Sequence, residues 1–84
     1  MMGRLLPSDK DVDWYLDEMS SHVKEIRELL EGGDRVYRGR ETCGEHARVE
    51  AYDLVVLVAE VFGMVEVLDA VPDEIIERFN RKRR

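Results

Sequence analysis

The sequence predicts an all-α protein, a bundle of about three helices that is completed by homo-oligomerisation. Apolar residues recur at helical spacing in the two longest segments, and glycine or proline separates the segments. The chain has 84 residues, enough for one domain spanning residues 1–84. A domain of this size buries only about 60–65% of its unfolded surface. Its single cysteine, Cys43, forms no internal disulfide, so we expect a homodimer or homotetramer to supply further core.

The first helix is expected to begin at about Asp9, because Ser8 and Asp11 have the spacing of a capping box. It is expected to end at Gly32-Gly33. Between these points an apolar stripe follows the helical period: Val12, Leu16, Met19, Val23, Ile26 and Leu30. This spacing predicts an amphipathic helix.

The face of this helix away from the stripe carries Trp14, Glu25 and Glu28. A large aromatic ring and two acids would be exposed there in a single chain. We therefore expect a second helix, or another subunit, to cover part of this face.

Residues 32–44 are expected to form a loop, because this short segment contains four glycines. It also contains Arg35, Arg38 and Arg40, whose guanidinium groups suit phosphate oxygens. The glycine placement matches no phosphate-cradling motif, so a merely solvated loop is the alternative interpretation.

A second helix is expected from about Glu45 to Phe62, with Gly63 ending it. Its β-branched run LVVLVAEV is also typical of a strand. The segment is too long for a typical strand, however, and a helical period gathers one set of residues on a single face: His46, Glu50, Asp53, Leu57 and Glu60. Its other sides are apolar almost all round, as in a buried helix.

Residues 64–71 are expected to form a short helical turn or an irregular connection. Pro72, with Asp73 and Glu74 behind it, opens the last helix. That helix ends in a basic run, residues 81–84, where the helix dipole favours cations.

Four carboxylates in two pairs at i,i+3 spacing indicate the chemistry: Glu25 with Glu28, and Glu50 with Asp53. Each pair puts two carboxylates on nearly one helix face. Asp53 opens an apolar run, where an ionised group must be paired or bound to a metal. Two such helices form an all-oxygen site of the kind that Mg²⁺ prefers.

Each pair also has a simpler interpretation. Glu25 and Glu28 suit a solvated helix face, with Lys24 beside Glu28. Asp53 suits a salt bridge to one of the thirteen basic residues. His46, one turn before Glu50, suits either a helix-start histidine or a group near a metal.

The two carboxylate motifs resemble those of the MazG-like all-α nucleoside triphosphate pyrophosphohydrolases. The family fingerprint is EExxE, a variable spacer and ExxD. Here KEIRE at residues 24–28 matches the first part, and EAYD at residues 50–53 matches the second. The flanking VEAYDLVVLVAEVFG is similar to the family's ExxDLLxxLxxLADxLG, and IIERFNRKRR is similar to a terminal KLxKNxxR.

This resemblance implies an all-α fold, bound Mg²⁺ and a nucleoside triphosphate substrate that is cleaved to monophosphate and pyrophosphate. The implied metal ligands are Glu25, Glu28, Glu50 and Asp53. Glu25 or Glu28 is the expected general base for the attacking water. The expected substrate-binding residues are Trp14, Arg38 and Asn80. Trp14 would stack on the base, and its alternative interpretation is burial at a subunit contact.

An alternative hypothesis is a helical oligomerisation or regulatory protein that keeps this fold with little or no turnover. Lys24 and Arg27, which depart from the family pattern, favour it. The formal net charge of −6 argues against a nucleic-acid-binding role, despite the basic C-terminal run. No segment has the length and hydropathy of a signal peptide or membrane span, so we expect a soluble, cytoplasmic protein.

Overall fold

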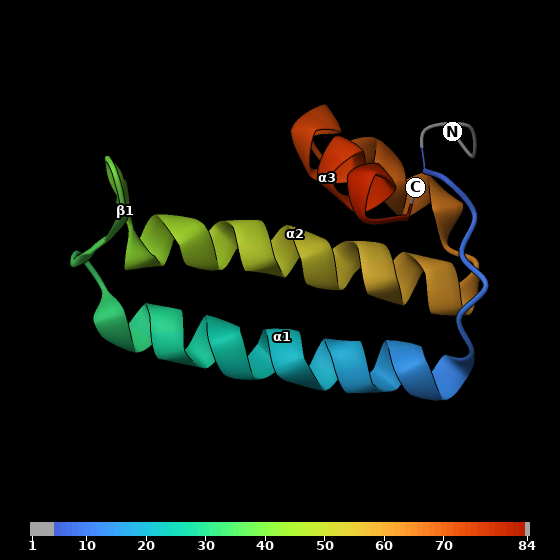
Figure 1. Ribbon diagram of the computed structural model, residues 1–84, viewed down its shortest axis with the longest axis horizontal. Helices are drawn as coiled ribbons and strands as arrows, with labels where there is room; N and C mark the ends of the chain where they lie inside the picture. Colours follow the sequence, from blue (N-terminus) through green and yellow to red (C-terminus); the bar gives the residue numbers. More distant parts are fainter. Residues whose placement is uncertain (1–4, 84) are drawn as a thin grey trace.

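Two long antiparallel helices, α1 (Val12–Gly32) and α2 (Cys43–Phe62), form the body of the molecule. A shorter helix, α3 (Asp73–Arg83), lies against α2 on the side away from α1 (Figure 1). The computed structural model describes residues 5–83, which are mostly helical. No helix within these residues has the length and apolar character needed to cross a membrane.

Helix α1 begins at Val12, three residues later than the predicted start at Asp9. Asp11 is the residue that caps it, because its carboxylate accepts a hydrogen bond from the Trp14 backbone N–H at 2.9 Å. The predicted end at Gly32-Gly33 is confirmed. Gly33 has a φ of 57° and donates its N–H to carbonyls of the last turn.

The predicted loop contains a small antiparallel hairpin, β1 (Val36–Arg38) with β2 (Glu41–Thr42). Gly39, with a φ of 54°, makes the tight turn between the strands. The expectation of a loop is therefore wrong for the residues of the two strands. Glycine content indicated a turn there, but it could not show that the two flanks pair with each other.

Helix α2 starts at Cys43, directly after the hairpin. Thr42 and Glu45 form a reciprocal capping box: the Thr42 hydroxyl accepts the Glu45 N–H, and the Glu45 carboxylate accepts the Thr42 N–H. Gly63 ends α2 in the left-handed conformation, with a φ of 67°, as predicted.

The connection after α2 is a 3₁₀ helix, η2 (Val65–Ala70), so the described residues form four helices rather than about three. The main apolar core lies where α2, η2 and α3 meet. Its buried members are Val56, Ala59, Leu68, Val71, Ile75 and Ile76. This core holds α3 over the middle of α2.

The apolar stripe of α1 is largely exposed, although an amphipathic helix ordinarily turns its apolar face toward the core. Val12, Leu16, Val23 and Leu30 retain between 47% and 61% of their exposure. The side of α1 that carries Tyr15 and His22 packs toward α2 instead, and Tyr15 is buried. On this side, His22 contacts the carboxylates of Glu50 and Asp53 on α2.

The capping box positions the helix that carries Glu50 and Asp53, so its removal tests the fold. Thr42→Ala should lower the free energy of unfolding by about 1 kcal/mol, because one N–H loses its cap. Thr42→Ser keeps the hydroxyl and should stay close to the parent. Urea unfolding followed by circular dichroism measures both, and equal losses in the two variants would contradict the assignment.

Candidate functional site

Two acidic side chains are buried on one face of α2. Glu50 keeps 9% and Asp53 only 2% of its exposure. Their i,i+3 spacing sets them one turn apart, as the sequence predicted. Oδ2 of Asp53 contacts the Arg78 guanidinium, whereas Oδ1 is buried and meets no hydrogen-bond donor among the described residues. An acceptor left in this state costs free energy unless a donor or a cation meets it.

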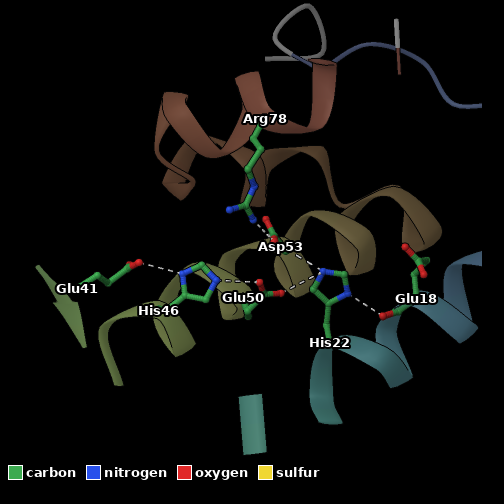
Figure 2. A network of polar contacts seen from close by, with 7 residues as sticks. All are labelled: Glu18, His22, Glu41, His46, Glu50, Asp53 and Arg78. Carbon is green, nitrogen blue, oxygen red and sulfur yellow. Dashed lines mark hydrogen bonds and ion pairs between the residues drawn. The ribbon is translucent and has the colours of Figure 1, made fainter. Parts of the chain in front are cut away.

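A histidine from α1 faces both acids (Figure 2). Nε2 of His22 lies 3.4 Å from Glu50 Oε2 and 3.6 Å from Asp53 Oδ2. Nδ1 of the same ring donates a hydrogen bond to the Glu18 carbonyl oxygen at 2.7 Å. This backbone contact orients the ring so that Nε2 points at the carboxylates, the arrangement usual for a metal-binding histidine.

Sequence reasoning missed His22. A usable signal was present, because His22 stands three residues before Glu25 and so repeats the i,i+3 spacing of the predicted carboxylate pairs. His22 borders the apolar stripe, one turn from Met19 and from Ile26, and the spacing of the stripe does not show that this border faces α2. The structure makes His22, and not only the acids, part of the group of possible ligands.

The other two predicted ligands lie differently. Glu25 shares a hydrogen bond with the Glu50 carboxyl group, although its own side chain is largely exposed. Glu28, further along α1, is exposed. The structure therefore gathers Glu50 and Asp53 beside His22, with Glu25 next to Glu50, while Glu28 lies on the open surface of the helix.

The cluster shifts the acidity of its members. A hydrogen bond to Asp53 raises the pKa of His22 to about 9; the Glu18 carbonyl and the charge of Glu50 add to the effect, and burial opposes it. Burial raises the pKa of Glu50, and the neighbouring charges of Asp53 and Glu25 raise it further. Without a bound cation, protons and Arg78 supply the positive charge that these acids need.

A second histidine extends the cluster toward the hairpin (Figure 2). Nε2 of His46 lies 3.3 Å from Glu50 Oε1, and Nδ1 lies 3.1 Å from Glu41 Oε2. The ring stacks on Tyr37 with centroids 4.1 Å apart. Arg38 covers the Tyr37 ring, so contacts within residues 5–83 link this predicted phosphate contact to the acids through Tyr37 and His46. His46 is both near the helix start and in contact with Glu50.

Arg78 reaches Asp53 from α3, which gives Asp53 the salt bridge that was one interpretation of the sequence. No local pattern pairs these two residues, because they are 25 positions apart and belong to different helices. Arg78 engages only Oδ2, so Oδ1 remains available to a ligand.

A cavity of about 560 Å³ adjoins the cluster, and His22 belongs to the walls of both. Trp14 and Phe79 supply aromatic walls, and the charged lining has two lysines, Lys10 and Lys82, together with two acids, Asp9 and Glu18. Arg83 also lines the cavity, held by hydrogen bonds to Glu60 and to the Leu6 carbonyl oxygen. Aromatic and cationic walls together suit a ligand that has a flat ring and negative charge.

The other predicted substrate contact, Asn80, has a structural partner. Its side-chain oxygen accepts a hydrogen bond from the Leu6 backbone N–H at 2.7 Å. Together with Arg83, it ties the segment before α1 to α3. Asn80 therefore helps to shape the cavity wall that Pro7 and Ser8 contribute.

The His22–Glu50–Asp53 cluster fits a divalent cation. One ligand atom from each residue lies within 4.8 Å of the others. The donor set of two carboxylates and one imidazole is of the kind that binds such ions, and Oδ1 of Asp53 is a buried acceptor with no partner among residues 5–83. The imidazole makes this set less purely oxygen than the sequence predicted.

No protein-family model matches the chain, and no curated protein or solved structure matches it either. The resemblance to the MazG-like superfamily therefore depends on the two carboxylate motifs and their flanking residues.

The raised pKa of His22 predicts a pH-dependent stability in the metal-free protein. Because the folded-state pKa of about 9 exceeds the ordinary 6.5, protonation favours the folded state. This stabilisation is fully present below pH 6.5 and is lost as the pH rises through about 9. Urea unfolding in the presence of a chelator should show the decline, and His22→Gln should flatten it.

His46→Gln is the matched control, because it removes the other imidazole beside Glu50 and leaves His22 in place. This variant should still lose stability over the same pH range. A profile for His22→Gln as steep as that of the parent would contradict the contribution of His22.

Proposed function

We propose that this protein is a small metal-dependent nucleoside triphosphate pyrophosphohydrolase that acts as a homo-oligomer. The observation that carries the proposal is the shared wall between the acidic cluster and the aromatic, basic cavity, which His22 provides. A triphosphate chain at the cluster and a base in the cavity would then be neighbours. The resemblance of the carboxylate motifs points to the same reaction.

Glu50, Asp53 and His22 would hold the divalent cation, with Glu25 beside Glu50 as a further oxygen donor. Mg²⁺ remains the proposed ion, and the imidazole also makes Mn²⁺ a good fit, since nitrogen donors favour transition metals. When bound, such an ion would neutralise phosphate charge and acidify the attacking water.

The chain's own groups would do the remaining work. Glu25 is largely exposed and close to the cluster, so it is able to accept the proton of the water that attacks the α-phosphorus. The bond from that phosphorus to the bridging oxygen breaks, and pyrophosphate leaves. Arg78 is close enough to the site to turn from Asp53 to a phosphate oxygen, and Lys10 and Lys82 would steer the anion inward.

Arg78 also supports the alternative function. A guanidinium group on Asp53 satisfies much of the charge of this acid without any cation. In a regulatory or scaffolding protein with the same fold, this contact would be permanent. The two functions differ in one property: only the hydrolase gains from exchange of Arg78 for a metal and a phosphate.

Pyrophosphate release from a panel of nucleoside triphosphates, with and without Mg²⁺ or Mn²⁺, tests the proposal. We expect metal-dependent release that Glu50→Gln and Asp53→Asn each lower by roughly 100-fold or more, because ligand loss removes several kcal/mol of charge stabilisation. Glu31→Gln is the control, since it makes the same chemical change at an exposed position of α1.

Glu25→Gln and Glu28→Gln sharpen the same assay. The carboxylate motif predicts that both variants lose activity. Because Glu25 contacts Glu50 and Glu28 is exposed, we expect the larger loss for Glu25→Gln. No release from any substrate in the panel, with folded protein and either metal, would overturn the hydrolase and favour the regulatory alternative.

Trp14 tests the proposed base site separately from turnover. Trp14→Ala should weaken nucleotide binding roughly tenfold, since stacking of a base on an aromatic ring contributes about 1–3 kcal/mol. Trp14→Phe keeps an aromatic face and should bind close to the parent. The rise in Tm on addition of nucleotide measures this, and an equal rise in Trp14→Ala would exclude Trp14 from the site.

A further inference from the structure

One face of α1 is apolar and is left largely uncovered by the described residues. Val12 and Leu30, at its two ends, are 57% and 61% exposed, and Leu16 and Val23 between them are 47% exposed. Met19 and Ile26 complete the stripe and are half-buried. Shallow grooves run along it, one of which lies between Leu16, Met19 and Val23 on one side and Ser20, Lys24 and Arg27 on the other.

The spacing of the stripe is that of a coiled-coil seam. Its members are separated alternately by four and three residues over the whole of α1: Val12, Leu16, Met19, Val23, Ile26 and Leu30. A helix that packs only within its own chain usually shows a broader apolar band. The narrow, strict repeat therefore indicates a second helix of similar length on this face.

The stripe is also complementary to itself. Each member has a counterpart equally far on the other side of Ser21: Met19 with Val23, Leu16 with Ile26, and Val12 with Leu30. Consider two antiparallel copies of α1 related by a two-fold axis that crosses the stripe at the level of Ser21. Every member of the stripe would then lie beside its counterpart in the other copy. An interface of this kind uses the same patch on both subunits.

Charges beside the stripe select the antiparallel direction. Asp13, Ser20 and Arg27 are exposed and recur every seven residues along its outer flank. In the antiparallel pair, Asp13 of each copy lies opposite Arg27 of the other, with Ser20 near the axis. Asp17 and Lys24, in the next row, repeat the same order of charge. A parallel pair would instead set acid level with acid.

The apolar face continues onto α2. Ile26 and Leu30 of α1 share one shallow groove with Ala47 and Ala51 of α2. Ala51 is half-buried, and its small side chain allows another helix to approach closely, whereas Ala47 is already buried. An α1–α2 hairpin paired with a second hairpin across this face gives a four-helix bundle, in which two-layer packing covers what a single hairpin leaves open.

We propose that the stripe of α1 binds the stripe of a second copy of this chain. The two α1 helices run antiparallel about an axis at the level of Ser21, and Asp13 of each copy contacts Arg27 of the other. This inference does not depend on the catalytic proposal, because no member of the stripe belongs to the acidic cluster or lines the cavity beside it. The dimer contact includes none of the three residues of the acidic cluster.

Asp13→Arg and Arg27→Asp test the direction and register together. Each variant alone sets like charges opposite each other at two places in its homodimer. This repulsion should raise the dissociation constant of the dimer roughly thirty-fold. A mixture of the two variants restores both opposite-charge contacts and should form heterodimers as tight as the parent dimer. Sedimentation equilibrium across a dilution series measures all four samples.

Val23→Glu tests the seam itself and should convert the dimer to a folded monomer, because a buried, unpaired carboxylate is strongly unfavourable. Glu66→Arg, at an exposed position of η2, is the control for a change of charge and should stay dimeric. A parent protein that is monomeric throughout, a dimer that survives Val23→Glu, or a mixture no tighter than its components would each overturn the proposal.

Discussion

Two carboxylates buried in an apolar helix are the constraint on which the rest of this structure depends. Glu50 and Asp53 occupy the interior side of α2, where an unpaired charge is strongly unfavourable. Partners come from both neighbours: His22 from α1 and Arg78 from α3. The three helices therefore meet at these acids, and the apolar core between α2, η2 and α3 lies beside them.

The same constraint explains the orientation of α1. A helix with a clean apolar stripe would ordinarily turn that stripe to its own core. Here the side of α1 that carries Tyr15 and His22 faces α2, where His22 meets the two acids, and most of the stripe is left outward. The exposed stripe is therefore free to be buried in a contact between subunits.

The charge balance at the cluster links structure to the proposed chemistry. Protonated His22 and Arg78 supply two positive groups beside the buried acids, and Asp53 Oδ1 remains without a partner among the described residues. Such a site is close to neutral as it stands, so a cation would have to displace a proton from His22 and draw Arg78 away from Asp53. Anionic substrate in the adjoining cavity would help by offering Arg78 and the lysines new partners.

The sequence by itself determined the helices, their glycine ends, and the two carboxylates of α2, because capping, periodicity and i,i+3 spacing are local properties. Only the tertiary structure decided which side of α1 faces inward, that His22 joins the acids while Glu28 stays exposed, and that Arg78 binds Asp53. The hairpin, too, depends on pairing between separate segments. These outcomes depend on contacts between residues of separate helices. The spacing of residues along one helix does not show which residues of another helix will lie beside it.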